Sequence, residues 1–253
     1  MPIPKILPAG DRALVAEFGD SIQEETNDLV HALEQKIEQG HISGITETVP
    51  TFRSLLIYYD PSVISGNKLR ESVLSLCEHL ESGKKEKGRI LEIPCCYGSH
   101  FGKDLPDLME YTDLTMEEII SIHSSVNYKI YMLGFLPGFV YLGGLDKRIE
   151  MPRLKTPRTK IPKGAVGIGG NQTGVYPLDS PGGWRLIGST PVDFYDPSRE
   201  EPVLCRAGDY IRFVPITSCD YYDIRQMIQR GTYQLSIRSC TDGSNHPAPS
   251  SSF

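Results

Sequence analysis

The chain has 253 residues, of which 39% are hydrophobic and 23% charged, a composition typical of a soluble globular protein with one large or two small domains. Its formal net charge of −6 argues against nucleic acid as the main partner. No apolar run is long enough to span a bilayer, and residues 1–12 lack the core of a signal peptide, so we expect a cytoplasmic protein with no membrane partner.

The first 83 residues are expected to form a small α+β domain. Alternating or β-branched segments predict strands, and apolar residues spaced three and four apart predict helices. A capping box at Ser21–Glu24 is expected to start the first helix, and Gly40 to end it. In chain order the elements are a strand over 12–18, a helix over 21–40, strands over 45–49 and 53–59, and a helix that carries residues 69–80.

Residues 82–88 contain no apolar residue and a glycine near each end, which predicts a linker. We therefore expect a second domain over 88–240 and a polar, disordered tail over 241–253. Many short strands separated by turn residues favour a β-barrel or a sandwich. The expected elements are a strand over 89–93, helices over 105–111 and 116–123 with a capping box at Thr115 and Glu118, strands over 127–133, 203–205, 209–214 and 233–237, and a helix over 219–230.

Residues 134–191 are unusual in composition. They hold 12 of the 24 glycines, seven prolines and the single tryptophan, Trp184. Dense glycine and proline with short apolar runs between them predict short strands joined by tight turns. The glycine-rich segment 163–170 contains no GxxxxGK[ST] sequence and no strand that opens into a helix, so turn glycines explain it better than a nucleotide site.

The same stretch is basic, with eight cations and three acids in a chain of net charge −6. A local basic cluster on an acidic protein indicates attraction of a carboxylate, a phosphate or an acidic surface, although solvated loop lysines would give the same composition. Arg153 and Arg158 each follow a proline, and a stiff backbone favours a bidentate guanidinium clamp.

Polar side chains in this stretch suggest a binding site for a small amide or carboxylate. The candidates are Gln172, Thr173, Tyr176 and Ser180, with Trp184 either as an apolar wall or as core. Four further residues form either a partner surface or core: Phe135, Pro137, Phe139 and Tyr141.

Metal binding is not expected, because the stretch has no histidine or cysteine and none of the six cysteines of the chain forms a CxxC pair. We expect the cysteines to be reduced core residues. A hydroxyl–histidine pair would need His100 or His123 from outside the stretch. The more ordinary role for His123 is a helix-end histidine close to the carbonyls of its own helix.

The words GFLPGFVYLGGLD (134–146), GGNQTGVYP (169–177) and SPGGW (180–184) resemble the signature of the B-subunit family of 5-oxoprolinase. This family includes the sporulation-kinase inhibitor KipI and proteins called allophanate hydrolase subunit 1. The resemblance extends more loosely to 10–13 and 93–98 and so covers nearly the whole chain. It implies a cyclophilin-like β-barrel after the small N-terminal α/β sandwich domain.

The resemblance further implies an ATP-dependent enzyme that opens 5-oxo-L-proline to L-glutamate. This chain would be its B subunit, in direct contact with the C subunit and working with the A subunit as well. Arg153 and Arg158 would then hold carboxylate or phosphate, while Gln172, Thr173 and Tyr176 would orient the ring. No general base and no ATP site are evident in the chain, so ATP is expected as co-substrate of the complex.

The alternative is a KipI-like inhibitor of a sensor histidine kinase, which would use the Phe135–Tyr141 patch and the basic loop as a binding surface. Prolyl isomerase activity ranks lower, because a fold does not determine a function. Allophanate hydrolysis is not favoured, because the chain has no amidase-type Ser-Ser-Lys segment.

Overall fold

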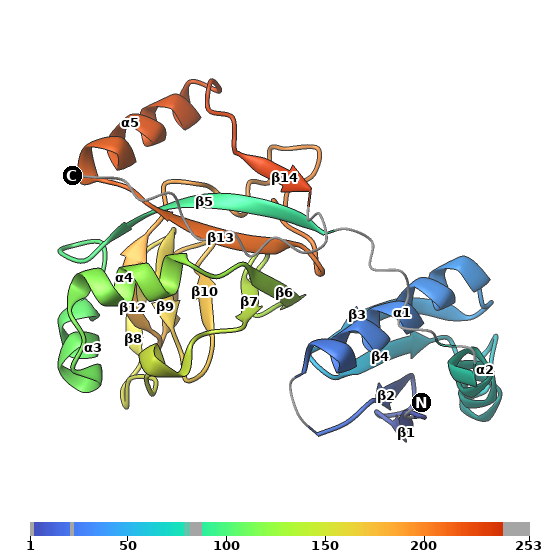
Figure 1. Cartoon of the computed structure of the whole chain (residues 1–253). Helices are drawn as coiled ribbons and strands as arrows, with labels where there is room; N and C mark the ends of the chain where they lie inside the picture. Colours follow the sequence, from blue (N-terminus) through green and yellow to red (C-terminus); the bar gives the residue numbers. More distant parts are fainter. Residues whose placement is uncertain (1–2, 21–22, 79, 81–87, 240–253) are drawn as a thin grey trace. The chain divides into compact units, whose positions relative to one another are not determined.

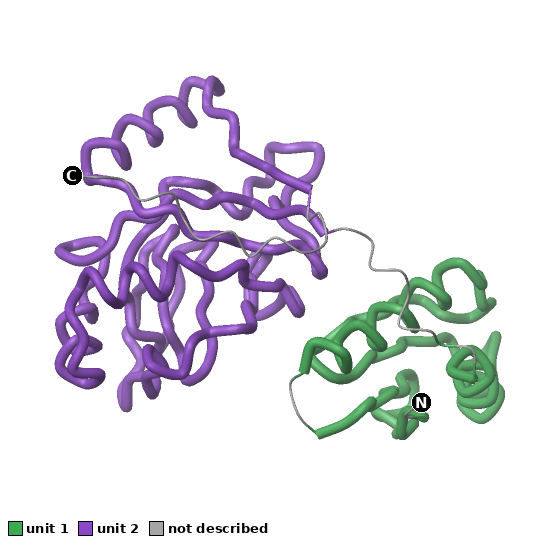
Figure 2. The backbone as a smooth tube through the Cα atoms, viewed as in Figure 1, with its two compact units in different colours: residues 1–86 green, residues 87–253 purple. Residues whose placement is uncertain are grey.

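The computed structural model describes residues 3–20, 23–78, 80 and 88–239. The chain divides into two units, residues 1–86 and 87–253, which Figure 2 colours separately. The linker predicted over 82–88 lies outside the described residues except for Gly88, and so does the tail predicted over 241–253. Each unit has its own hydrophobic core.

The first unit is a four-stranded antiparallel sheet with two helices packed against one face. The sheet order is β1-β2-β4-β3, and Leu55 and Ile57 of β4 are fully buried against Val30 and Leu33 of α1. Strands β2, β3 and β4 and both helices confirm the sequence-based expectation for this region, whereas strand β1 was not predicted. Their bounds are β1 Lys5–Pro8, β2 Ala13–Glu17, α1 Glu24–Gly40, β3 Ile45–Pro50, β4 Ser54–Tyr59 and α2 Gly66–Glu78.

The start of α1 differs from the prediction. The helix begins at Glu24 with Gln23 as an N-cap that makes no side-chain capping bond, so the capping box expected at Ser21 is wrong. Two acids in the first turn, Glu24 and Glu25, favour this start because they interact with the positive end of the helix dipole. The helix ends at Gly40 as expected, and the left-handed residue that follows is His41, with φ of 42°.

The second unit is a closed β-barrel. Its sheet runs β12-β9-β10-β7-β6-β13-β5, and a further pairing of β12 with β5 closes the ring of seven strands. This confirms the predicted barrel. The strands are β5 Arg89–Tyr97, β6 Tyr128–Leu133, β7 Val140–Gly143, β9 Ala165–Ile168, β10 Thr173–Val175, β12 Arg185–Ser189 and β13 Tyr210–Pro215.

Strand β5 makes closure possible because its nine residues serve three neighbours (Figure 1). One edge pairs with β13 in parallel along residues 90–95. The other edge pairs with β14 (Ile237–Ser239) through residues 89–91 and with β12 through Cys96 and Tyr97. The predicted strand over 89–93 is therefore only the first half of this element, and the strand expected over 233–237 lies instead at 237–239.

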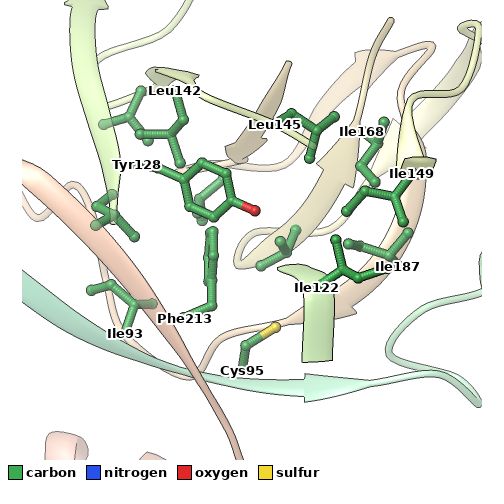
Figure 3. Packing of buried hydrophobic residues seen from close by; sticks show 14 of the residues in the cluster. Ile93, Cys95, Ile122, Tyr128, Leu142, Leu145, Ile149, Ile168, Ile187 and Phe213 are labelled. Carbon is green, nitrogen blue, oxygen red and sulfur yellow. The ribbon is translucent and has the colours of Figure 1, made fainter. Parts of the chain in front are cut away.

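The barrel interior is filled by side chains, as in other small barrels. Figure 3 shows Tyr128 and Phe213 side by side among aliphatic residues such as Ile93, Leu142 and Ile187. The five cysteines that the structure describes are free, and Cys95 and Cys205 belong to this core. Cys77, Cys95, Cys96 and Cys205 are buried, as expected of core residues, whereas Cys219 is exposed, so the expectation is wrong for that residue.

Helices α3 (Leu105–Thr112) and α4 (Met116–Ser124) follow β5, and α4 has the predicted capping box of Thr115 and Glu118. A short 3₁₀ helix, η1 (Lys147–Ile149), follows β7. Helix α5 (Ser218–Gln229) lies outside β5 and buries none of its residues (Figure 1). Residues 203–205 make only an isolated bridge between Val203 and Tyr195 rather than the predicted strand. No helix in the described ranges is long and apolar enough to cross a membrane.

Candidate functional site

The Trp184 side chain lies outside the barrel core and packs on the backbone of Gly169 and Gly174. A Cβ atom at Gly169 would come within 2.5 Å of the indole, and one at Gly174 within 3.0 Å. Both glycines lie in or next to the β9–β10 hairpin. The indole ring therefore packs directly on their backbone, and a larger residue at either position would displace the ring. Both glycines are needed for close packing, and for Gly169 this differs from the turn role that we predicted for the glycine-rich segment 163–170. Gly164 and Gly170 do take positive φ values, of 84° and 70°, and fit the turn role.

A second, smaller core surrounds this tryptophan. A two-stranded sheet, β8 (Arg158–Ile161) with β11 (Ser180–Gly182), borders it separately from the barrel. Phe139, Tyr176 and Trp184 are 2%, 2% and 4% exposed and meet edge to face, with ring centroids 5.3 to 6.4 Å apart. Such contacts are the favoured geometry of aromatic pairs. Trp184 is thus core on one side and a platform on the other.

Arg153 occupies the outer side of that platform. Its guanidinium carbon lies 5.5 Å from the centroid of the Trp184 ring, a cation–π arrangement, and its side chain is exposed. The charge of Arg153 also acts on two phenols, because it partly offsets the burial that raises the pKa values of Tyr141 and Tyr176. The structure thus brings Arg153, Tyr141, Tyr176 and Trp184 together.

Most cations of the basic stretch are neutralised by nearby acids. Five of the eight form ion pairs: Arg148 with Asp146, Arg158 with Asp104, Lys160 with Asp179, Lys163 with Asp193 and Arg185 with Asp107. Within the described ranges, Lys147, Arg153 and Lys155 form no ion pair with a carboxylate. Only Arg153 of these three lies on an aromatic platform, so it is the cation of this stretch best placed to bind an external anion.

Arg158 is bound within the unit. Its two terminal nitrogens donate to the two oxygens of Asp104 over 2.9 and 2.6 Å, and Asp104 raises the pKa of Arg158. The same buried carboxylate accepts the backbone N–H of Leu186 over 2.6 Å. The bidentate clamp expected of Arg158 is therefore formed, with a protein carboxylate as its partner.

Asp104 is a residue that the sequence analysis did not single out. Its position just before α3 looks like an ordinary N-cap, but its side chain makes no capping bond and joins β8 to β12 instead. The spacing of 54 residues between Asp104 and Arg158 leaves no local signal of the pair.

Thr173 and His123 lie inside the barrel, away from Arg153. The Thr173 hydroxyl donates to the Gly167 carbonyl over 3.0 Å, so it must accept from Nε2–H of His123, 2.9 Å away. Nδ1 of His123 then accepts from the Tyr97 hydroxyl over 2.7 Å. His123 is fully buried and burial lowers its pKa to about 3, so this hydroxyl–histidine pair is not a useful base at neutral pH.

The remaining candidates differ in burial and in their contacts. Gln172 lies in the β9–β10 turn, which is hydrogen-bonded through Gly170 to Met151, two residues before Arg153. Ser180 is 7% exposed, and its hydroxyl has no hydrogen-bond partner among the described residues. Of the four aromatic-patch residues, Phe135 and Pro137 are exposed, Tyr141 is half-buried and Phe139 is core.

Comparison with known proteins assigns the chain to a family. Residues 4–205 match the family described as carboxyltransferase domain, subdomain C and D. The B subunit of 5-oxoprolinase from Bacillus subtilis is 42% identical over 231 residues, which cover 86% of this chain and 95% of that protein. The chain belongs to the B-subunit family of 5-oxoprolinase.

Solved structures agree with the fold of this B-subunit family. The structure of TTHA0988 has a TM-score of 0.73 and 35% identity, and the match covers 82% of this chain but 40% of TTHA0988. The urea amidolyase of K. lactis has a TM-score of 0.74 at 22% identity, over 94% of this chain and 16% of that protein. At this identity the urea amidolyase supports the fold alone.

The structure explains two of the sequence motifs that characterise the family. GGNQTG (169–174) contains Gly169 and Gly174, on which the Trp184 ring packs, and SPGGW (180–184) contains Trp184 itself. The glycine-rich segment does not fit ATP, because it runs through β9 into the turn before strand β10 and opens no helix to hold phosphate. No group of three or more His, Cys, Asp or Glu side chains that could hold a metal ion is found in the described part of the chain.

Proposed function

We propose that this chain is the B subunit of an ATP-dependent 5-oxoprolinase, which opens the lactam of 5-oxo-L-proline to L-glutamate while ATP is hydrolysed to ADP and phosphate. The observation that supports this most is the 42% identity to the corresponding protein of Bacillus subtilis over 95% of its length. The chain acts in a complex with the A and C subunits in the cytoplasm.

Within this complex, Arg153 binds the carboxylate of 5-oxo-L-proline. Three features support this role: the side chain is exposed, it has no carboxylate partner in the described residues, and its guanidinium carbon lies 5.5 Å from the centroid of the Trp184 ring. A planar guanidinium held in place can donate two parallel hydrogen bonds to a carboxylate, which lysine cannot do. We assign Gln172 and Tyr176, whose phenol is influenced by the charge of Arg153, to orienting the ring. Thr173 and Arg158 instead make hydrogen bonds within the unit.

ATP binds to another component of the complex. Among the described residues there is no phosphate-binding loop and no group of side chains that could hold a metal ion, and the His123–Thr173 pair is buried inside the barrel. The contribution of this chain is therefore to bind and orient the lactam, and its reaction depends on groups from the other subunits.

The test is an assay in which subunits are omitted one at a time. The chain is co-expressed with the A and C subunits, and phosphate and glutamate released in the presence of 5-oxo-L-proline and ATP are measured with all three and with each one left out. Glutamate release only from the complete set supports the proposal. An inactive complete set contradicts it, and suppression of histidine-kinase autophosphorylation by the chain alone would favour the KipI-like alternative.

A further inference from the structure

Strand β7 turns the Tyr141 side chain away from the barrel interior. Val140 and Leu142 are fully buried in the barrel core, so the residues that alternate with them, Phe139 and Tyr141, point outward. The Tyr141 ring lies 4.9 Å from the Phe139 ring and 6.4 Å from the Trp184 ring, measured between centroids. Tyr141 therefore belongs to the aromatic edge on which Arg153 lies.

These two outward residues differ in burial and in chemistry. Phe139 is 2% exposed and its side chain is entirely apolar, whereas Tyr141 is half-buried and carries a hydroxyl. A phenylalanine at position 141 would make the same ring contacts, so these contacts do not account for a tyrosine. A half-buried tyrosine typically packs its ring on apolar neighbours and turns its polar end toward solvent or a ligand.

Tyr141 and Arg153 lie beside the same indole, and the Arg153 guanidinium carbon is 5.5 Å from its centroid. Burial raises the pKa of the Tyr141 phenol and the charge of Arg153 opposes this rise, so the phenol keeps its proton at neutral pH and can donate a hydrogen bond. Tyr176 is 2% exposed, and its oxygen accepts the backbone N–H of Trp184. Tyr141 is therefore the more accessible of the two phenols beside this indole.

The chemistry of 5-oxo-L-proline fits this pairing of a guanidinium with a phenol. Its ring nitrogen is bonded to the carbon that carries the carboxylate, and its ring carbonyl is bonded to that nitrogen. A lactam held through its carboxylate at Arg153 thus has its N–H and C=O among the side chains that surround the guanidinium. L-Proline has the same ring and carboxylate but no oxo group, so selectivity for the lactam requires a donor that meets the carbonyl oxygen.

We propose that Tyr141 is a substrate-binding residue whose hydroxyl donates to the lactam carbonyl oxygen while Arg153 holds the carboxylate. Arg153 alone would bind any small carboxylate, whereas the two groups together select a small cyclic amide that bears a carboxylate next to its nitrogen. This inference rests on the proposed function and adds to it the residue that recognises the lactam itself.

The test is the steady-state kinetics of the chain assembled with the A and C subunits. Tyr141→Phe removes one hydroxyl and keeps the ring contacts, so kcat/KM for 5-oxo-L-proline should fall about threefold to tenfold, as expected for the loss of one hydrogen bond. The melting temperature should not change. Tyr111→Phe removes the hydroxyl of a tyrosine that is 60% exposed on α3 and should match the unchanged complex.

A competing inhibitor separates recognition of the amide from recognition of the carboxylate. Cyclopentanecarboxylate has the five-membered ring and the carboxylate but no amide. Its inhibition constant should be the same for Tyr141→Phe as for the unchanged complex, and should rise about tenfold or more for Arg153→Ala.

Unchanged kcat/KM in Tyr141→Phe beside a lowered value in Arg153→Ala would overturn the assignment of Tyr141 and leave the proposed function intact. Weaker inhibition of Tyr141→Phe by cyclopentanecarboxylate, or a lower melting temperature, would also overturn it, because the hydroxyl would then act without the amide. An active complex that the inhibitor does not affect would contradict binding through the carboxylate, on which the place of the lactam beside Tyr141 depends. An inactive complete set would overturn the proposed function itself.

Discussion

The interior of the barrel and its outer aromatic edge use similar groups for different ends. Inside, Tyr97, His123 and Thr173 form a chain in which each polar atom has a partner and the imidazole is kept neutral by burial. Outside, Arg153 is exposed beside the Trp184 ring and has no carboxylate partner in the described structure. The comparison teaches that a polar cluster indicates binding only where hydrogen-bonding capacity is left over.

The largest effect on stability is expected at the border between the two regions, where Asp104 pairs with Arg158. Asp104→Asn removes a buried charge that holds both the guanidinium and the Leu186 N–H, and should lower the free energy of unfolding by about 3 kcal/mol. Urea unfolding followed by fluorescence of Trp184, the only tryptophan, reports the second unit directly. Glu201→Gln, which breaks a pair that is 69% exposed on both sides, should change stability by less than about 1 kcal/mol. Equal midpoints for the two variants would refute a bracing role for Asp104.

A smaller effect is expected at the platform. Gly169→Ala places a Cβ against the rigid indole and should destabilise the second unit by about 1–3 kcal/mol while shifting the emission of Trp184. The matched control is Gly183→Ala, because the nearest atom to a Cβ there is 3.7 Å away. An unchanged emission spectrum in Gly169→Ala would show that the indole does not rest on this glycine.

The burial of His123 inside the barrel should make the free energy of unfolding depend on pH. The pKa of His123 is lowered from 6.5 to about 3 in the folded chain, so below pH 6.5 the unfolded chain takes up a proton that the folded chain cannot. This contribution to stability is present above the unfolded pKa and is lost as pH falls toward 3, by about 1.4 kcal/mol per pH unit. His123→Gln removes the titrating group, so the difference in unfolding free energy between the two proteins should change with pH in this window. Parallel pH profiles would mean that His123 takes up its proton in the folded state.

The sequence predicted the elements of both units well, because amphipathic spacing and turn residues are local signals. It missed the start of α1, where Ser21 gave a capping signal but the helix begins at Glu24. The strand expected over 233–237 was also misplaced, because the pairing of Ile237 with Leu91 of β5 moves it to 237–239.

The site was predictable only in part. Arg153, Tyr176 and Trp184 were selected from composition and resemblance, and they do come together. The local sequence could not separate Arg153 from Arg158, because both follow a proline, and their difference depends on Asp104 more than fifty residues away. The alternation within β10 likewise could not show that Thr173 turns toward His123 inside the barrel.

The measurement that tests the account most directly is the steady-state kinetics of the assembled complex with Arg153 changed. Arg153→Ala should lower kcat/KM for 5-oxo-L-proline about tenfold to a hundredfold, mainly through a higher KM, because a carboxylate contact is made in the ground state as well as the transition state. Arg153→Lys should recover part of the loss, and Arg148→Ala, a neighbouring exposed arginine paired with Asp146, should match the unchanged complex. An assembled Arg153→Ala complex with unchanged kcat/KM would contradict the assignment of Arg153 as the carboxylate-binding residue.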